Sequence, residues 1–219
     1  MIKTQAGFRV LTLLALASLC AAFGGGCAVT DPKTGLTNVH TVAPGVLVRG
    51  GQPSERGFRT LRDEYGVRTV VNLNDSTAKT EGKLVEALGM RYVALPSNAF
   101  RPDGDKVLDF LKAVQELQRM PNGGGGPGGA VYVHCLHGMD RTGYAVAAYR
   151  ILLDGWDADR AMAELRGHQA FPHALMFPAI EPFVRNVYRD RETLRTRLAP
   201  TPTTPEPSMA KADTSAAGG

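Results

Sequence analysis

Residues 131–143 read Val131-Tyr-Val-His134-Cys135-Leu-His-Gly138-Met-Asp140-Arg141-Thr142-Gly143. The β-branched and aromatic residues at the beginning of this stretch predict a buried strand over residues 130–134. Gly138 permits a sharp turn, and a helical pattern follows from about Arg141 to Leu153. A strand, a tight loop and a helix in immediate succession form the unit from which the rest of the fold is worked out.

Strand-like and helix-like segments alternate on both sides of this unit. Apolar runs predict further strands over residues 46–48, 69–73 and 91–95. Amphipathic spacing predicts helices over residues 55–65, 80–88, 105–120, 158–165 and 175–196, with Ser54 and Asp157 as N-caps. We therefore predict an α/β domain with a central, mostly parallel sheet of four to five strands flanked by helices. Ligands of such sheets bind at the carboxyl ends of the strands, where residues 130–134 lead.

The loop between that strand and helix has the chemistry of an oxyanion site. A tight loop supplies converging backbone N–H donors, and the helix that follows directs the positive end of its dipole at them. The planar fork of Arg141 matches two phosphate oxygens. The same field favours the thiolate of Cys135, which is then placed for in-line attack on phosphorus and formation of a cysteinyl-phosphate. Because these groups stabilise the charge, we expect no metal and no cofactor.

The pattern from His134 to Gly143, His-Cys-x-x-Gly-x-x-Arg-Thr-Gly, resembles the signature of the cysteine-based protein tyrosine and dual-specificity phosphatases. Residues 45–53 and 69–73 also resemble the opening of compact bacterial and fungal members, the atypical dual-specificity type. The resemblance covers about residues 44–170 and implies a phosphatase-type fold with a Cys-x5-Arg phosphate loop. It implies a phosphoric monoester hydrolase acting on phosphotyrosine, with phosphoserine and phosphothreonine as further substrates.

Roles for individual residues follow from the same resemblance. His134 orients the loop and helps to keep Cys135 ionised, Gly143 supports the helix, and the hydroxyl of Thr142 bonds the sulfur. The residues expected to contact the substrate are Leu136, His137, Gly138, Met139 and Thr142. For His137 the alternative is a solvated side chain at the loop surface.

The general acid is the part of the pattern that departs from the family. Relatives place an aspartate on the loop after the strand equivalent to residues 91–95, where this chain has Asn98-Ala99. Asp140, directly before the loop arginine, is our first candidate, since some lipid-phosphate members such as myotubularins carry an aspartate there. Its alternative role is a bond to the loop or a pair with a neighbouring base. Asp103 is the second candidate, and its alternative role is to cap a helix.

The ends of the chain differ in composition from its middle. The 219 residues are 43% hydrophobic, which fits one globular domain with tails. Lys3 and Arg9 precede an apolar run that is too short to span a bilayer comfortably, as in an export signal. We expect a signal peptide over residues 1–26, a linker over 27–43, a phosphatase domain over 44–198 and a disordered tail over 199–219, which is rich in Pro, Thr, Ala and Ser.

Cys27 follows three glycines and resembles the acylated cysteine of a bacterial lipoprotein. The alternative is ordinary cleavage near Ala21 or Ala22. We thus expect an exported protein, either anchored to a membrane through acylated Cys27 or periplasmic or secreted. Cys135 then has no cysteine to pair with, which argues against a disulfide framework. Without Lys3 and Arg9 the net charge falls from +4 to +2, which argues against a nucleic-acid partner.

Three further functions remain open at this point. A phosphoinositide, another phospholipid headgroup or an inositol phosphate is the alternative substrate class, favoured by Asp140 and by a membrane anchor. The doubtful general acid allows a catalytically weak phosphate-binding module. A sulfurtransferase also uses a cysteine loop before a helix, but the Arg-Thr-Gly ending argues against it. The expected partner is therefore a phosphorylated protein or lipid.

Overall fold

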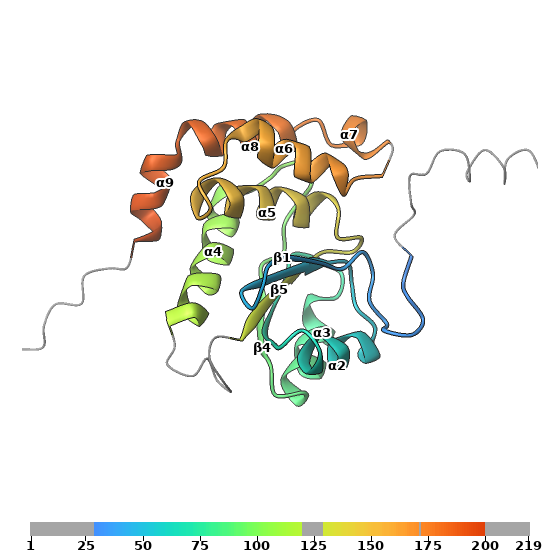
Figure 1. The fold of residues 1–219 in the computed structure, drawn as a ribbon. Helices are drawn as coiled ribbons and strands as arrows, with labels where there is room; N and C mark the ends of the chain where they lie inside the picture. Colours follow the sequence, from blue (N-terminus) through green and yellow to red (C-terminus); the bar gives the residue numbers. More distant parts are fainter. Residues whose placement is uncertain (1–28, 120–128, 171, 200–219) are drawn as a thin grey trace, which may run out of the picture.

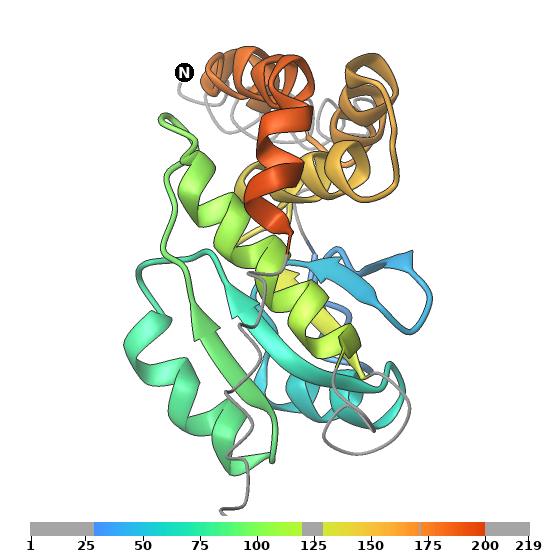
Figure 2. The ribbon, with the colours of Figure 1, turned by 90° about the vertical axis from the view of Figure 1, so that its left-hand side faces the viewer.

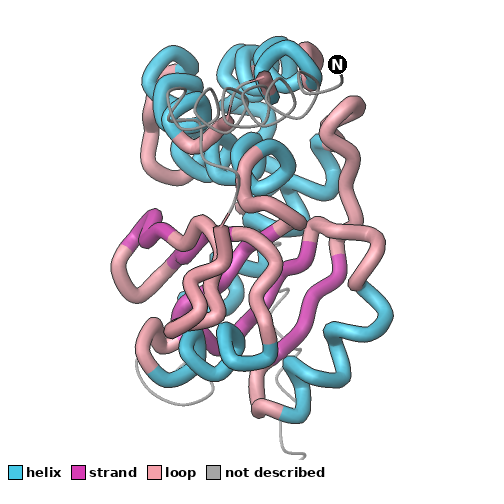
Figure 3. The backbone as a smooth tube through the Cα atoms, turned by 90° about the vertical axis from the view of Figure 1, so that its right-hand side faces the viewer, coloured by secondary structure: helices cyan, strands magenta, loops and turns pink. Residues whose placement is uncertain are grey.

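Five strands form one mostly parallel sheet between two layers of helices (Figures 1 and 3). The computed structural model describes residues 29–119, 129–170 and 172–199. The strand order is β1-β2-β5-β3-β4, with β1 antiparallel to β2 and all other neighbours parallel. The predicted fold class is confirmed. The strands are β1 His40–Ala43, β2 Leu47–Gly50, β3 Val67–Asn72, β4 Arg91–Ala94 and β5 Ala130–His134.

Two helices cover one face of the sheet and the remaining helices cover the other (Figure 1). The first face carries α2 Glu55–Asp63 and α3 Ala78–Ala87. On the second face α4 crosses the sheet and contacts β5, and α9 packs beside α4 (Figure 2). The helices of this face, several of them stacked on α5, are α4 Gly104–Arg119, α5 Asp140–Leu152, α6 Ala158–Gly167, α7 His173–Met176, α8 Ile180–Arg189 and α9 Arg191–Leu198.

The sequence of β5 explains why this strand lies in the middle. All five of its residues are buried, as expected for a parallel strand covered on both faces. Val131 and Val133 belong to the apolar cluster under α4, α5 and α8, whereas Ala130 and Tyr132 belong to the cluster under α2 and α3. Because successive side chains point to opposite faces, β5 ties both cores together. It therefore fixes where the loop that follows it emerges.

The parallel register brings the carboxyl ends of the strands into one row. His134 lies opposite Gly50 on one side and opposite Asn72 on the other, and Asn72 lies opposite Ala94. The loops that leave β2, β3, β4 and β5 therefore meet at the same edge of the sheet. Ligands of open α/β sheets bind at this edge.

The predicted linker over residues 27–43 is wrong for the part that the structure describes. β1 forms within it and pairs with β2, and Thr30 pairs with Thr37. Leu36 is buried in the core beneath α2. This segment pairs with β2 and packs beneath α2, so tertiary contacts, and not a local sequence pattern, give it its order. The domain therefore begins before residue 44.

The single helix predicted over residues 175–196 is also wrong. α7 ends at Met176 and Phe177 leaves the helical region, with φ of −123° and ψ of 62°, because the residue before a proline, here Pro178, is disfavoured in that region. A second break at Asp190 separates α8 from α9. The N-caps predicted from the sequence are confirmed, since Ser54 and Asp157 each accept a backbone N–H three residues ahead.

Several predictions lie outside the described residues. These are the signal peptide over residues 1–26, the acylation of Cys27 and the tail beyond residue 199. Within the described part of the chain, every helix is too short or too polar to cross a membrane.

Candidate active site

Cys135 and Arg141 line the same cavity at the carboxyl edge of the sheet. The cavity measures about 400 Å³, and Cys135 in its lining is 3% exposed. The thiol is therefore buried, but in the wall of an open hollow. The other walls come from three directions: Asp75 after β3, residues 97–100 after β4, and His173, Met176 and Phe177 from α7 and its end.

The loop from Cys135 to Met139 turns its carbonyl groups outward. The carbonyl oxygens of Leu136, His137 and Gly138 accept hydrogen bonds from Gln52 N at 3.0 Å, Asn38 Nδ2 at 3.3 Å and Arg49 Nη2 at 2.8 Å. In a planar trans peptide, the N–H of the following residue points in the direction opposite to the carbonyl oxygen. The N–H groups of residues 137–139 are thus directed to the inner side of the loop, as in the anion-binding nests of backbone donors.

Gly138 is required where this loop touches the chain leaving β2. Its φ of +74° lies in the left-handed region that favours glycine. A Cβ there would lie 2.4 to 2.6 Å from backbone atoms of Gly50 and Gly51. Any other residue would push the two segments apart and break the outward hydrogen bonds.

Arg49 is a buried cation behind the loop that the sequence analysis missed. It is 1% exposed, and besides Nη2, which donates to Gly138 O, its Nε and Nη1 have no partner among the described residues. Burial lowers the pKa of Arg49 to about 10, although the negative charges of Glu164 and Cys135 oppose the shift. The guanidinium is therefore still charged at neutral pH. The sequence feature that could have pointed to Arg49 is its position directly before Gly50-Gly51.

His134 and Glu81 form a buried pair behind Cys135. His134 Nε2 lies 2.9 Å from Glu81 Oε1, and Nδ1 lies 3.2 Å from the carbonyl oxygen of Cys135. The other oxygen of Glu81 accepts from the side-chain amide of Gln52. The imidazole is thus held between α3 and the start of the loop. Glu81 was not predicted, because it stands 53 residues before His134 in an otherwise ordinary helix.

The guanidinium of Arg141 reaches from α5 to the loop after β3. Its Nη1 lies 3.4 Å from both Leu73 O and Asn74 Oδ1, and 3.7 Å from Asp75 Oδ1. These distances exceed the usual 2.9–3.0 Å, so the contacts are weak. The fork is accordingly available for a stronger bidentate partner in the cavity. Asp75 also lines the cavity, and this acidic residue was not predicted from the sequence.

Thr142 departs from its expected role. Its hydroxyl donates to Gly50 O at 3.5 Å, and not to the sulfur of Cys135 as predicted. The first turn of α5 packs against the chain that leaves β2, so the carbonyl oxygen of Gly50 lies within reach of the Thr142 hydroxyl. Gly143 supports close helix packing as expected, since a Cβ there would lie 3.1 Å from Leu165.

The remaining loop residues differ in what they offer. Leu136 and His137 line the cavity with their side chains. The side chain of Met139 is 5% exposed and belongs to the interior, so a contact of Met139 with substrate would use its backbone N–H. Gly138 likewise has only backbone to contribute.

The structure separates the two predicted acids. Asp140 begins α5, is buried and lines the cavity. Asp103 instead caps α4, with Oδ1 accepting from the backbone N–H groups of Asp105 and Lys106. Asp103 does not belong to the described lining of the cavity. Geometry therefore favours Asp140 over Asp103.

Comparison with known proteins gives a family match. A family model described as a DSP-PTPase phosphatase fused to NAD+ kinase matches residues 29–174. Dual specificity protein phosphatase TpbA of Pseudomonas aeruginosa (strain UCBPP-PA14) is 32% identical over 130 residues, 59% of this chain and 53% of TpbA. Dual specificity protein phosphatase 26 of Homo sapiens is 28% identical over 137 residues, 63% of this chain and 62% of that protein. The chain spans about half the length of the TpbA relatives.

Solved structures share the fold. The crystal structure of P. aeruginosa TpbA aligns with a TM-score of 0.58 and 27% identity, over 81% of this chain and 98% of that one. PTPMT1 in complex with PI(5)P aligns with a TM-score of 0.56 over 74% of this chain and 99% of that one. At 20% identity the second likeness concerns the fold alone.

Arg49→Met tests whether the buried guanidinium holds the loop. One lost hydrogen bond costs about 1–2 kcal/mol, and removal of a buried charge with two unpartnered donors offsets part of that cost. We expect the free energy of unfolding to fall by less than about 2 kcal/mol, while kcat/KM for an aryl phosphate falls roughly 10²-fold through misplacement of the loop. Urea unfolding and steady-state kinetics measure the two effects. Arg59→Met, at an exposed site on α2, is the control. Unchanged kinetics in Arg49→Met would contradict the role.

Proposed function

Since the chain belongs to the DSP-PTPase phosphatase family, whose model matches residues 29–174, we propose that it hydrolyses phosphomonoesters through a cysteinyl-phosphate. The observation that carries the proposal is the shared cavity of Cys135 and Arg141 beside a loop in which the carbonyls of residues 136–138 point outward. A phosphate in this cavity meets backbone donors, the N-terminus of α5 and a guanidinium at once.

The reaction follows from these positions. The Cys135 thiolate attacks phosphorus, and the S–P bond forms as the bond to the leaving oxygen breaks. The N–H groups of residues 137–139 and Arg141 stabilise the charge on the transferring phosphoryl oxygens. Water then attacks the cysteinyl-phosphate, releases inorganic phosphate and regenerates the thiolate. His134, fixed by Glu81, holds the carbonyl of Cys135 during both steps.

The cavity fits a single phosphate on an aromatic group. The rings of Phe100 and Phe177, which both line the cavity, meet edge to face with their centroids 4.8 Å apart. Among the described lining residues Arg141 is the only arginine or lysine, whereas Asp75 and Asp140 carry negative charge. An inositol polyphosphate would need several cations there. We therefore propose phosphotyrosine in proteins as the substrate, with phosphoserine and phosphothreonine as secondary ones. The crystal structure of a P. aeruginosa TpbA variant in complex with pTyr, at 26% identity, supports the same substrate class.

Cys135→Ser tests the chemistry. We expect the variant to lose all measurable turnover of p-nitrophenyl phosphate, because a serine hydroxyl is not ionised at neutral pH. Vanadate should inhibit the parent, and EDTA should leave its rate unchanged. Circular dichroism checks that the variant folds. Full activity in the variant would end the proposal.

A substrate panel tests the substrate class. We expect phosphate release from a phosphotyrosyl peptide to exceed that from the matched phosphoseryl peptide and from dioctanoyl phosphatidylinositol 5-phosphate. Malachite-green detection of phosphate measures all three. Faster release from the lipid would favour the phosphoinositide alternative. Tight binding of the phosphotyrosyl peptide to the parent with no release would favour a phosphate-binding module.

We propose in addition that the chain is exported and anchored through acylated Cys27. The support is the sequence of residues 1–27, with its basic start, apolar run and small residues before the cysteine. In a bacterial host fed with labelled palmitate, the parent should incorporate label and Cys27→Ser should not. Cys20→Ser, inside the apolar run, is the matched control and should keep the label. Equal labelling of all three, or of none, would contradict the anchor.

A further inference from the structure

Asp140 is engaged by two side chains from the segment between α6 and α8. Its Oδ1 accepts from Gln169 Nε2 at 2.8 Å, and its Oδ2 lies 2.7 Å from His173 Nδ1. The side chain of Asp140 is 9% exposed, so both contacts are shielded from water. Asp140 is therefore arranged to hold and orient another group.

The group that it holds lies at the cavity wall. His173 uses Nδ1 for Asp140, so Nε2, on the far side of the ring, is the nitrogen left for a ligand. The side chain is 20% exposed and lines the same cavity as Cys135 and Arg141. The rings of Phe177 and His137 lie 5.8 and 6.4 Å away.

The ionisable groups around His173 come from three elements. Asp140 and Arg141 come from α5, Cys135 and His137 come from the loop after β5, and Asp75 comes from the loop after β3. α7 itself contributes no other ionisable side chain. Asp140 is the carboxylate in direct contact with the imidazole. The imidazole is thus held by a neighbouring carboxylate while it lines the cavity that would receive a phosphate.

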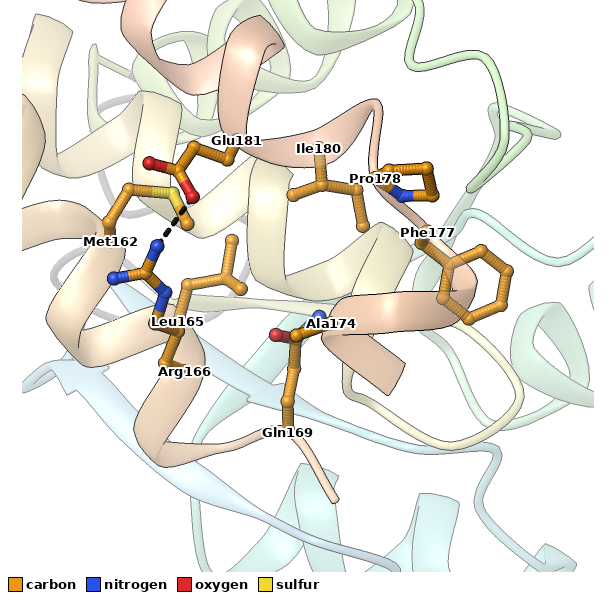
Figure 4. A pocket seen from close by; sticks show the side chains of 9 residues that line it. All are labelled: Met162, Leu165, Arg166, Gln169, Ala174, Phe177, Pro178, Ile180 and Glu181. Atoms are coloured by element: carbon orange, nitrogen blue, oxygen red, sulfur yellow. Dashed lines mark hydrogen bonds and ion pairs between the residues drawn. The ribbon is translucent and has the colours of Figure 1, made fainter. Parts of the chain in front are cut away.

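The same segment also borders a second cavity of about 210 Å³, with Ala174 and Phe177 in its wall (Figure 4). An ion pair between Arg166 and Glu181 crosses its rim. Gln169 also lines this second cavity (Figure 4). Of the two residues that bind Asp140, only His173 lines the cavity of Cys135.

We propose that His173 is a further catalytic residue, the proton donor and acceptor of the hydrolysis, held in place by Asp140. The inference rests on the proposed function. In the first step the S–P bond forms, the P–O bond breaks, and the proton on Nε2 passes to the leaving oxygen. In the second step water attacks phosphorus, the P–S bond breaks, and Nε2 takes the proton that the water loses. Asp140 remains a carboxylate throughout and positions the imidazole, as in the pairing of a histidine with a buried aspartate.

His173→Asn is the variant that isolates this role. The amide nitrogen of asparagine occupies nearly the place of Nδ1, so it retains the bond to Asp140 and the position of α7, but it has no group in the place of Nε2. A general acid matters most for a poor leaving group. We expect kcat/KM for phenyl phosphate to fall roughly 10²–10⁴-fold, and kcat/KM for 2,4-dinitrophenyl phosphate to change by less than roughly 3-fold. The basic limb of the pH–rate profile for phenyl phosphate should disappear.

Two further variants complete the test. Leu175→Ala, at an exposed position of the same helix, should match the parent with both substrates. In Asp140→Asn the imidazole loses the carboxylate that orients it, so kcat/KM should fall for phenyl phosphate and change little for 2,4-dinitrophenyl phosphate. Phenyl phosphate turnover by His173→Asn equal to that of the parent would overturn the proposal, as would an equal loss with both esters. No turnover of either ester by the parent would instead overturn the proposed function.

Discussion

The site depends on the outward rotation of three carbonyl groups in the loop after β5. A loop can direct its N–H groups at an anion only if its carbonyl oxygens find partners on the other side. Here those partners are the Gln52 amide, the Asn38 side chain and the Arg49 guanidinium. All three come from the chain around β1 and β2, which the parallel pairing of β2 with β5 holds against the loop. The glycine at 138 then follows from the close approach of the two segments.

The positive and negative side chains around this loop have different surroundings. Arg49 and Arg141 lie on opposite sides of it, and both favour an anion in the cavity. The two buried carboxylates near the loop are each paired with a histidine, Glu81 with His134 and Asp140 with the imidazole of α7. Unpaired carboxylates so near would repel a phosphate and raise the cost of burial. The pairing gives each buried carboxylate a hydrogen-bond partner and orients two imidazoles as well.

Features that depend on neighbouring residues in the sequence could be predicted, whereas features that depend on residues far apart in the sequence could not. The strand over residues 130–134 was predicted to the residue, because its apolar run and the glycine after it are local signals. β1 was missed, because its order comes from pairing with β2. Glu81 and Arg49 were missed for the same reason: their partners stand 53 and 89 positions away. The bond of Thr142 was misplaced, since only the fold shows which carbonyl lies nearest.

The departure of the loop after β4 from the family pattern has a structural counterpart. Where relatives carry an aspartate, this chain has Asn98-Ala99, followed by Phe100, whose ring packs on Phe177. The two rings on that side suit an aromatic leaving group but have no proton to give. Among the described lining residues, the first residues of α5 and α7 hold a buried carboxylate in contact with an imidazole, which is the proposed proton source. The break at Phe177 leaves residues 173–176 as a separate helical turn, and the imidazole that lines the cavity stands at its first position.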